Sequence, residues 1–372
     1  MNKSPSSLYI HIPFCEAICD YCDFPKLQYF RNFALRYIEK LKEEIASYHV
    51  GELKTIYIGG GTPTALEDDL FEDILSFVFP YTKGVEEYTI EANPESLSLT
   101  KLKLMKKYGV NRLSIGVEST DDKILSLINR HHTYQDVVTA INNAISVGID
   151  NINVDLILGL PHVKKDGLKK DLDNLLSLPI KHLSCYSLSV HPHTVFYLKG
   201  IQESSGDQER EYYDLVEEMT KANGFIHYEV SNFAKPGYES KHNYVYWKDE
   251  QYYGCGLGAA GYIGNIRYTN TRSLDKYLIG EFIEEKEVVE LSDDKEYFLM
   301  LNLRTIRGVI LKEYQERFNE DFYKKNQDKI DSFIKRGLLI YDRKEGRIYP
   351  TYQGMMILDT MLLDLFNENG ND

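Results

Sequence analysis

The stretch Leu8-Tyr-Ile-His-Ile-Pro-Phe-Cys15-Glu-Ala-Ile-Cys19-Asp-Tyr-Cys22 carries three cysteines directly after an expected β-strand. Thiolates separated by three and then two residues can all bind one small inorganic centre. Three protein ligands are one fewer than a structural zinc site or an iron–sulfur cluster normally has. A four-iron cluster bound in this way keeps one iron open to a substrate or cosubstrate. The stretch therefore predicts a reactive iron–sulfur centre. The alternatives are a zinc site completed by a distant His or Cys, or cysteines that bind no metal.

Length and charge limit the classes of protein that this chain can represent. Its 372 residues suggest two domains, or one large barrel with an appendage. Hydrophobic residues make up 43% of the chain, which is enough for substantial cores. The net charge of −14 lacks the basic footprint of a general nucleic-acid binder, so we expect no nucleic acid as partner.

The sequence also predicts a cytoplasmic protein. No apolar run approaches the roughly 18 to 20 residues of a membrane-spanning helix. The first seven residues, Met1 to Ser7, lack the apolar core of a secretion signal. Five cysteines, three of them clustered, do not form a disulfide framework in a chain of this length.

Residues 8 to about 190 alternate β-rich runs with helical patterns, which is typical of βα units and a parallel sheet. The last two β-rich runs, residues 151–158 and 183–190, are nearly continuous apolar segments, as expected of strands covered on both faces. Thr133 and Asp136 resemble a capping box at the start of one helix. Six units predict an α/β fold with an incomplete (β/α)6 barrel, whose site lies at the C-terminal mouth where the cysteines follow the first strand. The expected strands span residues 8–12, 56–58, 88–91, 112–117, 151–158 and 183–190.

The chain is expected to divide into three parts: a partial barrel over 1–200, an extension covering it over 201–289, and a C-terminal domain over 290–372. In the last part, Ser292 is expected to cap a helix that runs to about residue 307. A hairpin is expected to pair 338–341 with 347–350. Helices combined with a hairpin predict an α+β, winged-helix-like domain.

Two further motifs lie near the predicted mouth of the barrel. Three glycines in Gly59-Gly60-Gly61-Thr62-Pro63 allow the backbone to approach a ligand closely, although, taken alone, they are explained better by a tight strand-to-helix turn. Glu91 and Asp155 lie in expected strands, where a carboxylate is costly unless it is paired or liganded. These two carboxylates make Glu118 and Arg130 further candidates for a ligand site. The alternative to a ligand site is an internal salt bridge between Arg130 and one of the acids.

Two motifs in the later part of the chain are less specific. His242-Asn243-Tyr244-Val245-Tyr246-Trp247 reads either as an aromatic packing strip or as a His flanked by flat rings that suit a haem. Gly256-Leu257-Gly258-Ala259-Ala260-Gly261 fits the dinucleotide fingerprint by its letters. It lacks the surrounding βα unit, so a backbone bend is expected there instead.

The cysteines, together with residues 10–14 before them and Tyr21, Asp23 and Phe24 around them, resemble the radical S-adenosylmethionine (SAM) superfamily. The resemblance implies a [4Fe–4S] cluster on Cys15, Cys19 and Cys22, whose fourth iron chelates the amino and carboxylate groups of SAM. At Glu118 the coproporphyrinogen-oxidase-like branch of this superfamily more often has Gln, so a SAM contact there departs from the pattern. The other positions that match SAM contacts of this branch are Tyr9, Gly60, Gly61, Thr62, Glu91, Arg130 and Asp155.

Within that branch, the strip from His242 to Trp247 resembles the His-Asn-x-x-Tyr-Trp strip of HemW-type haem chaperones, and His242 is the expected haem contact. The oxygen-independent coproporphyrinogen III oxidase has a further cysteine two residues after the third, where this chain has Phe24. It also has a long N-terminal extension, whereas only eight residues precede Tyr9 here.

The resemblance therefore implies a haem chaperone that carries the cluster, SAM and haem, and that delivers haem to membrane or respiratory proteins. The alternative is the oxidase itself, a radical enzyme that decarboxylates coproporphyrinogen III. A tRNA-modifying radical enzyme is a third class, which the acidic charge disfavours. No catalytic residue is assigned. The sequence leaves open the haem acceptor, SAM cleavage, covalent haem attachment and the oligomeric state, a homodimer included.

Overall fold

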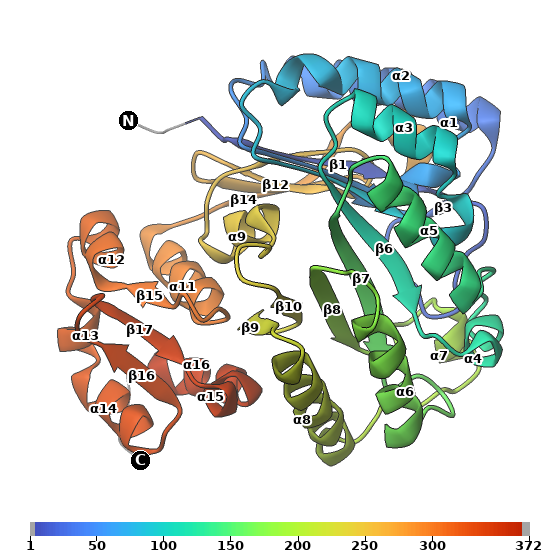
Figure 1. Ribbon diagram of the computed structural model, residues 1–372. Coiled ribbons are helices and arrows are strands. Elements are labelled where there is room, and N and C mark those ends of the chain that lie inside the picture. The colour runs from blue at the N-terminus through green and yellow to red at the C-terminus, as the bar shows by residue number, and fades with distance from the viewer. Residues whose placement is uncertain (1–3, 367–372) are drawn as a thin grey trace. The chain divides into compact units, whose positions relative to one another are not determined.

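The computed structural model describes residues 4–366. Residues 367–372 lie outside the described part, as do Met1 to Lys3 of the start that was expected to lack a secretion signal. The chain forms two compact units (Figure 1). The barrel unit comprises Met1–Ile226, Phe233–His242 and Gln251–Val288, and the C-terminal unit comprises His227–Asn232, Asn243–Glu250 and Val289–Asp372. The division predicted at residues 200 and 290 stays a prediction.

The barrel unit is built on one open sheet of mainly parallel strands. All six predicted strands are present and are paired in parallel, in chain order. Within this unit the order is β11-β1-β4-β5-β6-β7-β8-β10, so the sheet does not close and the prediction of an incomplete barrel is confirmed. The strands are β1 (Ser7–Ile12), β4 (Thr55–Gly60), β5 (Glu87–Ala92), β6 (Arg112–Glu118), β7 (Asn151–Leu158), β8 (His182–Ser187), β10 (Asn232–Ala234) and β11 (Tyr253–Cys255).

Helices cover the outer face of this sheet (Figure 1). The capping box of α5 is present as predicted, because Thr133 and Asp136 each accept from the other's backbone N–H. The long outer helices are α1 (Arg31–Ser47), α2 (Asp68–Val78), α3 (Leu99–Lys107), α5 (Tyr134–Ser146), α6 (Lys165–Leu176) and α8 (Gly206–Ala222). The short helices are η1 (Pro63–Ala65), η2 (Phe79–Thr82), η3 (Pro94–Ser96), α4 (Asp122–Leu127), α7 (Val195–Leu198), α10 (Leu274–Leu278) and α9 (Lys241–Trp247), which starts in the barrel unit and ends in the C-terminal unit.

The two faces of the sheet differ in chemistry. The outer face is apolar and packs with the helices into the main core, as Ile10, Ile58 and Ile90 do. The inner face carries polar side chains in rows set by the strand register, which we call the polar interior. One row is Tyr9, Tyr57, Thr89, Arg112 and Asn151; the next includes Glu91, Ser114, Asn153 and His182; Asp155 and Ser184 follow.

The expectation that 151–158 and 183–190 are apolar on both faces is therefore wrong. In β7, Asn151, Asn153 and Asp155 alternate with apolar residues and belong to the polar interior. The last strand also ends earlier than expected, since β8 stops at Ser187.

A small antiparallel sheet with the order β12-β13-β14 completes the barrel unit. The stretch that fits the dinucleotide fingerprint, residues 256–261, leads into strand β12 rather than into a helix, so the prediction of a bend is confirmed. Gly256 and Gly258 both have positive φ angles there, of 106° and 69°. The strands of the small antiparallel sheet are β12 (Ala260–Ile263), β13 (Ile266–Asn270) and β14 (Ile283–Val288).

The C-terminal unit combines helices with a three-stranded antiparallel sheet, in the order β15-β17-β16, which agrees with the winged-helix-like prediction. The predicted hairpin is present. The first helix begins at Leu291 after Glu290 and ends at Asn302, so the predicted cap at Ser292 and the end near residue 307 are wrong. The elements are β9 (Ile226–Glu229), which starts in the barrel unit, α11 (Leu291–Asn302), β15 (Val309–Ile310), α12 (Leu311–Phe318), α13 (Phe322–Lys325), α14 (Gln327–Lys335), β16 (Leu339–Asp342), β17 (Arg347–Pro350), α15 (Tyr352–Met356) and α16 (Leu358–Phe366).

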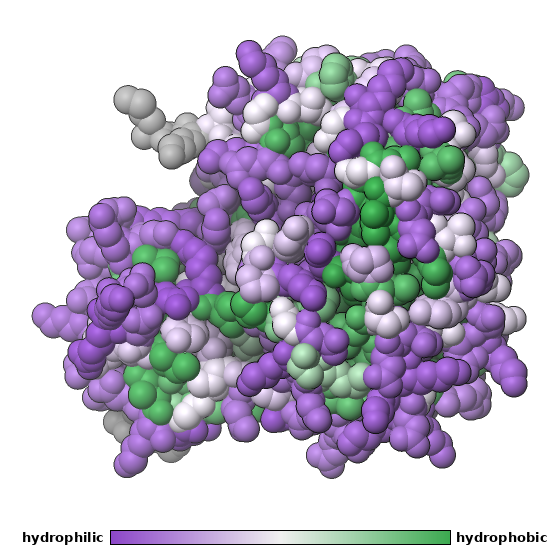
Figure 2. All heavy atoms as spheres, in the orientation of Figure 1, coloured by the Kyte–Doolittle hydropathy of each residue, from purple (hydrophilic) through white to green (hydrophobic). Residues whose placement is uncertain are grey.

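The visible surface is largely hydrophilic. Figure 2 shows hydrophilic side chains over most of the visible face, as expected for a chain with 27% charged residues. Across residues 4–366, no helix combines the length and the apolar character that crossing a membrane would require.

Candidate functional site

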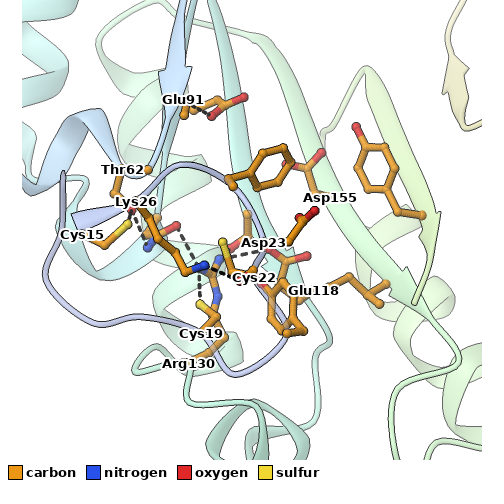
Figure 3. A pocket seen from close by; sticks show the side chains of 18 of the residues that line it. Cys15, Cys19, Cys22, Asp23, Lys26, Thr62, Glu91, Glu118, Arg130 and Asp155 are labelled. Atoms are coloured by element: carbon orange, nitrogen blue, oxygen red, sulfur yellow. Dashed lines mark hydrogen bonds and ion pairs between the residues drawn. The ribbon is translucent and has the colours of Figure 1, made fainter. Parts of the chain in front are cut away.

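A cavity of about 340 Å³ lies at the C-terminal ends of the parallel strands, where the site of an α/β barrel is expected (Figure 3). Its walls come from the cysteine loop and from the ends of β4, β5, β6, β7 and β8. Ten of the predicted site residues line it: Cys15, Cys19, Cys22, Gly60, Gly61, Thr62, Glu91, Glu118, Arg130 and Asp155. Tyr9 and His242 do not line it.

The cysteine loop is closed by a pair of short parallel strands, β2 (Phe14–Cys15) and β3 (Leu27–Gln28). All its cysteines are free. The hydroxyl of Thr62 lies 3.6 Å from Cys15 Sγ, and Arg130 Nη1 lies 3.7 Å from Cys19 Sγ. The loop therefore presents three thiols to one cavity, beside a cation and a hydroxyl donor that suit an anionic thiolate centre.

Burial changes the acidity of these thiols. It raises the pKa of Cys15 to about 11, and it also raises the pKa of Cys22. Within residues 4–366, no group of three or more His, Cys, Asp or Glu side chains has the arrangement of a metal-ion site. A cluster differs from such a site because each thiolate binds a different iron atom, and three free thiols around one cavity fit that requirement.

The glycine turn at the end of β4 packs closely against its neighbours. A side chain at Gly59 would overlap the Glu91 carboxyl group, with an added Cβ only 2.6 Å from its Cδ atom. Gly60 has a φ of 113°, and its N–H donates to Glu91 Oε2 at 2.9 Å. Gly60 and Gly61 also line the cavity. The turn is thus both a tight backbone turn and a wall of the cavity, so the two interpretations of the sequence do not exclude each other.

Two carboxylates of the polar interior point towards the cavity. Glu91 accepts from the Tyr57 hydroxyl at 2.7 Å, and Asp155 accepts from Asn153 Nδ2 at 2.8 Å. Burial raises the pKa of both carboxyl groups. Neither has an ion pair among the described residues. Their charged forms are stabilised by these hydrogen bonds and, at a distance, by the positive charge of Arg112.

Glu118 and Arg130 form the internal ion pair that the sequence left open. Arg130 Nη2 lies 3.3 Å from Glu118 Oε1, and both side chains are buried. Arg130 also donates to Asn93 Oδ1 at 3.0 Å. Burial raises the pKa of Glu118 to about 7, and its φ of 67° is unusual for a residue with a side chain. Strained backbone of this kind is often found at functional sites.

Tyr9 lies behind the cavity and contacts a residue that the sequence analysis missed. Its hydroxyl is 3.0 Å from His11 Nδ1, and His11 Nε2 donates to the backbone oxygen of Pro25 at 2.7 Å. Because Pro25 follows the last cysteine of the loop, His11 holds the end of that loop against β1. The alternation of Tyr9 and His11 with apolar neighbours was the signal that places both on the inner face.

His242 lies far from the cavity. Its Nδ1 is 2.8 Å from Thr55 Oγ1, and its backbone N–H donates to Glu87 Oε1 at 2.9 Å. Thr55 and Gly60 are the two ends of β4, which places them about 17 Å apart at the usual rise of a strand. His242 is fully buried, and burial lowers its pKa to about 3. Its role as a haem contact stays a prediction, and the ring has no exposed surface.

Comparisons with known proteins agree with this site. Residues 9–175 match the family model of the radical SAM superfamily. The heme chaperone HemW of Lactococcus lactis subsp. lactis (strain IL1403) is 37% identical over 99% of this chain and 100% of its own length. That of Bacillus subtilis (strain 168) is 39% identical, covering 94% of this chain and 96% of its own. That of Escherichia coli (strain K12) is 33% identical, covering 82% and 84%.

Among solved structures, the coproporphyrinogen III oxidase HemN from Escherichia coli, a radical SAM enzyme, matches with a TM-score of 0.84 over 99% of this chain and 91% of its own. The two sequences are 21% identical. At that identity the match establishes a shared fold.

Proposed function

Because this chain belongs to the HemW family of haem chaperones, within the radical SAM superfamily, we propose that it binds haem and passes it to haem-dependent proteins. Family membership implies a [4Fe–4S] cluster and SAM. The observation that carries the proposal is similarity to HemW chaperones along almost the whole chain, including the C-terminal unit. The location we propose is the cytoplasm, and the acceptors we propose are membrane proteins of respiration.

Within the cavity, each group of residues has a proposed task. Cys15, Cys19 and Cys22 hold the cluster, which can supply an electron to SAM when both are bound. The turn at Gly60 and Gly61 offers backbone groups at close range, as a ligand with amino and carboxylate groups requires. The remaining residues that we propose to contact SAM are Thr62, Glu91, Glu118, Arg130 and Asp155, with Tyr9 behind them.

Haem has two places that deserve testing. His242 is proposed from the family strip, and a haem that reaches it must displace the residues that bury it. Phe24 and Tyr186 line the cavity and are 63% and 44% exposed, so they offer aromatic surface to a flat macrocycle at the mouth. Haem binding at one place or the other would be weakened by different substitutions.

The test is a haem titration of anaerobically reconstituted full-length protein, followed in the Soret band. If His242 contacts haem, His242→Ala weakens binding, while His132→Ala, a change of another buried histidine that lies outside the polar interior, leaves binding intact. If haem docks at the cavity mouth instead, Phe24→Ser combined with Tyr186→Ser weakens binding and His242→Ala does not. Absence of haem binding by the wild type would refute the chaperone proposal.

The oxidase alternative has its own assay. The same protein is incubated with coproporphyrinogen III, SAM and a reductant under nitrogen. We expect no protoporphyrinogen, because Phe24 occupies the position of the oxidase's additional cysteine. Formation of protoporphyrinogen at catalytic turnover would replace the chaperone with the oxidase as the function of this chain.

A further inference from the structure

Arg112, the first residue of β6, is a buried cation with which no side chain of residues 4–366 forms an ion pair. It is 2% exposed and ranks among the largest fully buried side chains. Within residues 4–366 its guanidinium takes part in no hydrogen bond or ion pair, and its Nε is buried without a partner. Arginine stays charged in proteins, and an unpaired buried charge costs several kcal/mol. Packing alone does not explain such a residue.

The two neighbours of Arg112 in its strand row are also unsatisfied. Thr89 of β5 and Asn151 of β7 are its Cα partners on either side, and partners in parallel strands point to the same face. Thr89 Oγ1 and Asn151 Oδ1 are buried and have no hydrogen-bond partner among the described residues. Because nearly all buried polar groups in proteins are hydrogen-bonded, three adjacent exceptions indicate a site for a ligand.

The acids of the polar interior are committed elsewhere. Glu91 accepts from Tyr57 and from the Gly60 N–H. Glu87 accepts from Ser240 and from the backbone N–H groups of residues 241 and 242. Asp155 accepts from Asn153. The charge of Arg112 acts on its surroundings only at a distance, where it counteracts the rise in pKa that burial gives Glu91 and Asp155.

We propose that Arg112 and Thr89 bind a carboxylate group inside the polar interior. A planar guanidinium donates two parallel N–H groups to a carboxylate, and the Thr89 hydroxyl adds a third donor. The side-chain amide of Asn151 can turn its NH₂ group towards the same ligand. Ordered water would satisfy the hydrogen bonds of the row but would leave the charge uncompensated.

A carboxylate has two sources. One is a small free carboxylate. The other is a propionate of haem, and this source rests on the proposed function. It fits the place of Arg112, whose charge contributes to the lowered pKa of His242, so the two residues lie within electrostatic range of each other. The experiments below separate the two sources.

The first experiment uses sodium formate as the probe and thermal unfolding of the full-length protein as the readout, at constant ionic strength. We expect formate to raise the Tm of the wild type and of Arg36→Met, a control at an exposed arginine, and to leave Arg112→Met unchanged. Without formate, Arg112→Met is expected to unfold at a higher temperature than the wild type, because an uncompensated buried charge is gone.

An equal formate shift in Arg112→Met would overturn the proposal. So would a wild type that shows no shift and whose crystals, grown in formate, contain only water beside Arg112. If Arg112→Met does not fold, Thr89→Val keeps the shape of the side chain and removes only the hydroxyl. That variant is expected to weaken the formate response several-fold, and an unchanged response would contradict the proposed site.

The second experiment compares haem with haem dimethyl ester, in which both propionates are blocked. If a propionate is the ligand, esterification and Arg112→Met each weaken binding about tenfold, and combining them adds little further loss. If only formate responds, the ligand is a small free carboxylate. If no form binds haem, the proposed function fails, while the formate experiment still decides whether Arg112 binds a carboxylate.

Discussion

The inner face of the barrel sheet and the core of the C-terminal unit are both buried, yet they contain opposite kinds of side chain. The polar interior holds Arg112, Glu91 and Asp155. The C-terminal core is built from aromatic and aliphatic groups such as Phe298, whose ring lies 5.8 Å from that of Tyr314. Buried charge lowers stability unless it is paired, whereas close apolar packing raises it. The comparison indicates that the barrel gives up stability for ligand chemistry and that the C-terminal unit does not.

The largest expected effect concerns the ligand chemistry of the barrel. Cys15→Ser is expected to abolish most of the [4Fe–4S] absorbance after anaerobic reconstitution, because two thiolates remain where three are needed. The matched control is Cys185→Ser, since Cys185 is fully buried in the core between sheet and helices. Iron content and the visible spectrum give the measurement. A Cys15→Ser protein with full iron content would remove Cys15 from the cluster.

The next effect concerns the apolar core of the C-terminal unit. Phe322 is 1% exposed and packs against Tyr314, with ring centroids 5.3 Å apart. Phe322→Ala is expected to cost about 3 to 5 kcal/mol of the stability of this unit, from lost burial and the cavity that remains. Denaturant unfolding followed by circular dichroism gives the measurement. The cluster spectrum should not change in the folded variant.

The control for that change is Leu363→Ala, at a side chain that is 68% exposed, where a loss below about 1 kcal/mol is expected. If Phe322→Ala removed the cluster while the variant remained folded, the separation between a chemical barrel and a structural C-terminal unit would be wrong.

Glu229 is an exception within the C-terminal unit, because it is a carboxyl group with no exposed surface. Burial raises its pKa from 4.5 to about 7. The folded state therefore binds the proton more tightly than the unfolded state, and stability falls as the pH rises from about 4.5 to about 7. Glu229→Gln removes this loss. We expect the free energy of unfolding of the variant, relative to the wild type, to increase by about 1 to 3 kcal/mol between pH 5 and pH 8.

The measurement is urea unfolding at several pH values, with Glu345→Gln as a control at an exposed residue of the same unit. A difference between Glu229→Gln and the wild type that does not vary with pH would show that Glu229 is ionised in the folded protein throughout this range.

How far the sequence predicts this molecule follows from the range of the forces involved. The six parallel strands of the barrel depend on local patterns of apolar residues and turns, and the sequence predicts them correctly in outline. The prediction that β7 is apolar on both faces is wrong because Asn151, Asn153 and Asp155 alternate with apolar residues, and this alternation is itself a sequence signal for one polar face. The prediction of Ser292 as the N-cap is wrong because the helix already begins at Leu291, one residue before this serine, and the ends of helices are the parts least determined by sequence pattern.

The site was predicted unevenly for the same reason. Residues in short motifs at strand ends, such as Thr62 and Glu91, do meet at one cavity. His242 and Arg112 could not be placed, since their surroundings come from strands far apart in the chain. The hydrogen bond between His11 and Pro25 joins residues that are 14 positions apart in the chain, and it leaves no periodic signal in the sequence.

The smallest effect tests whether an outer helix contributes to stability alone. Thr133 caps α5 through its hydroxyl, which accepts from the Asp136 N–H. Thr133→Ala is expected to cost about 1 kcal/mol, the usual value for a lost N-cap. Thr139→Ala, in the exposed middle of the same helix, removes the same atoms without uncapping it and should change stability by less than about 0.5 kcal/mol. Amide hydrogen exchange should speed up at the start of α5 in Thr133→Ala only, with the cluster spectrum unchanged.

A shifted cluster spectrum in Thr133→Ala would mean that the outer helices influence the cavity. The contrast between an inner face that carries ligand chemistry and an outer face that only stabilises the fold would then fail within the barrel itself.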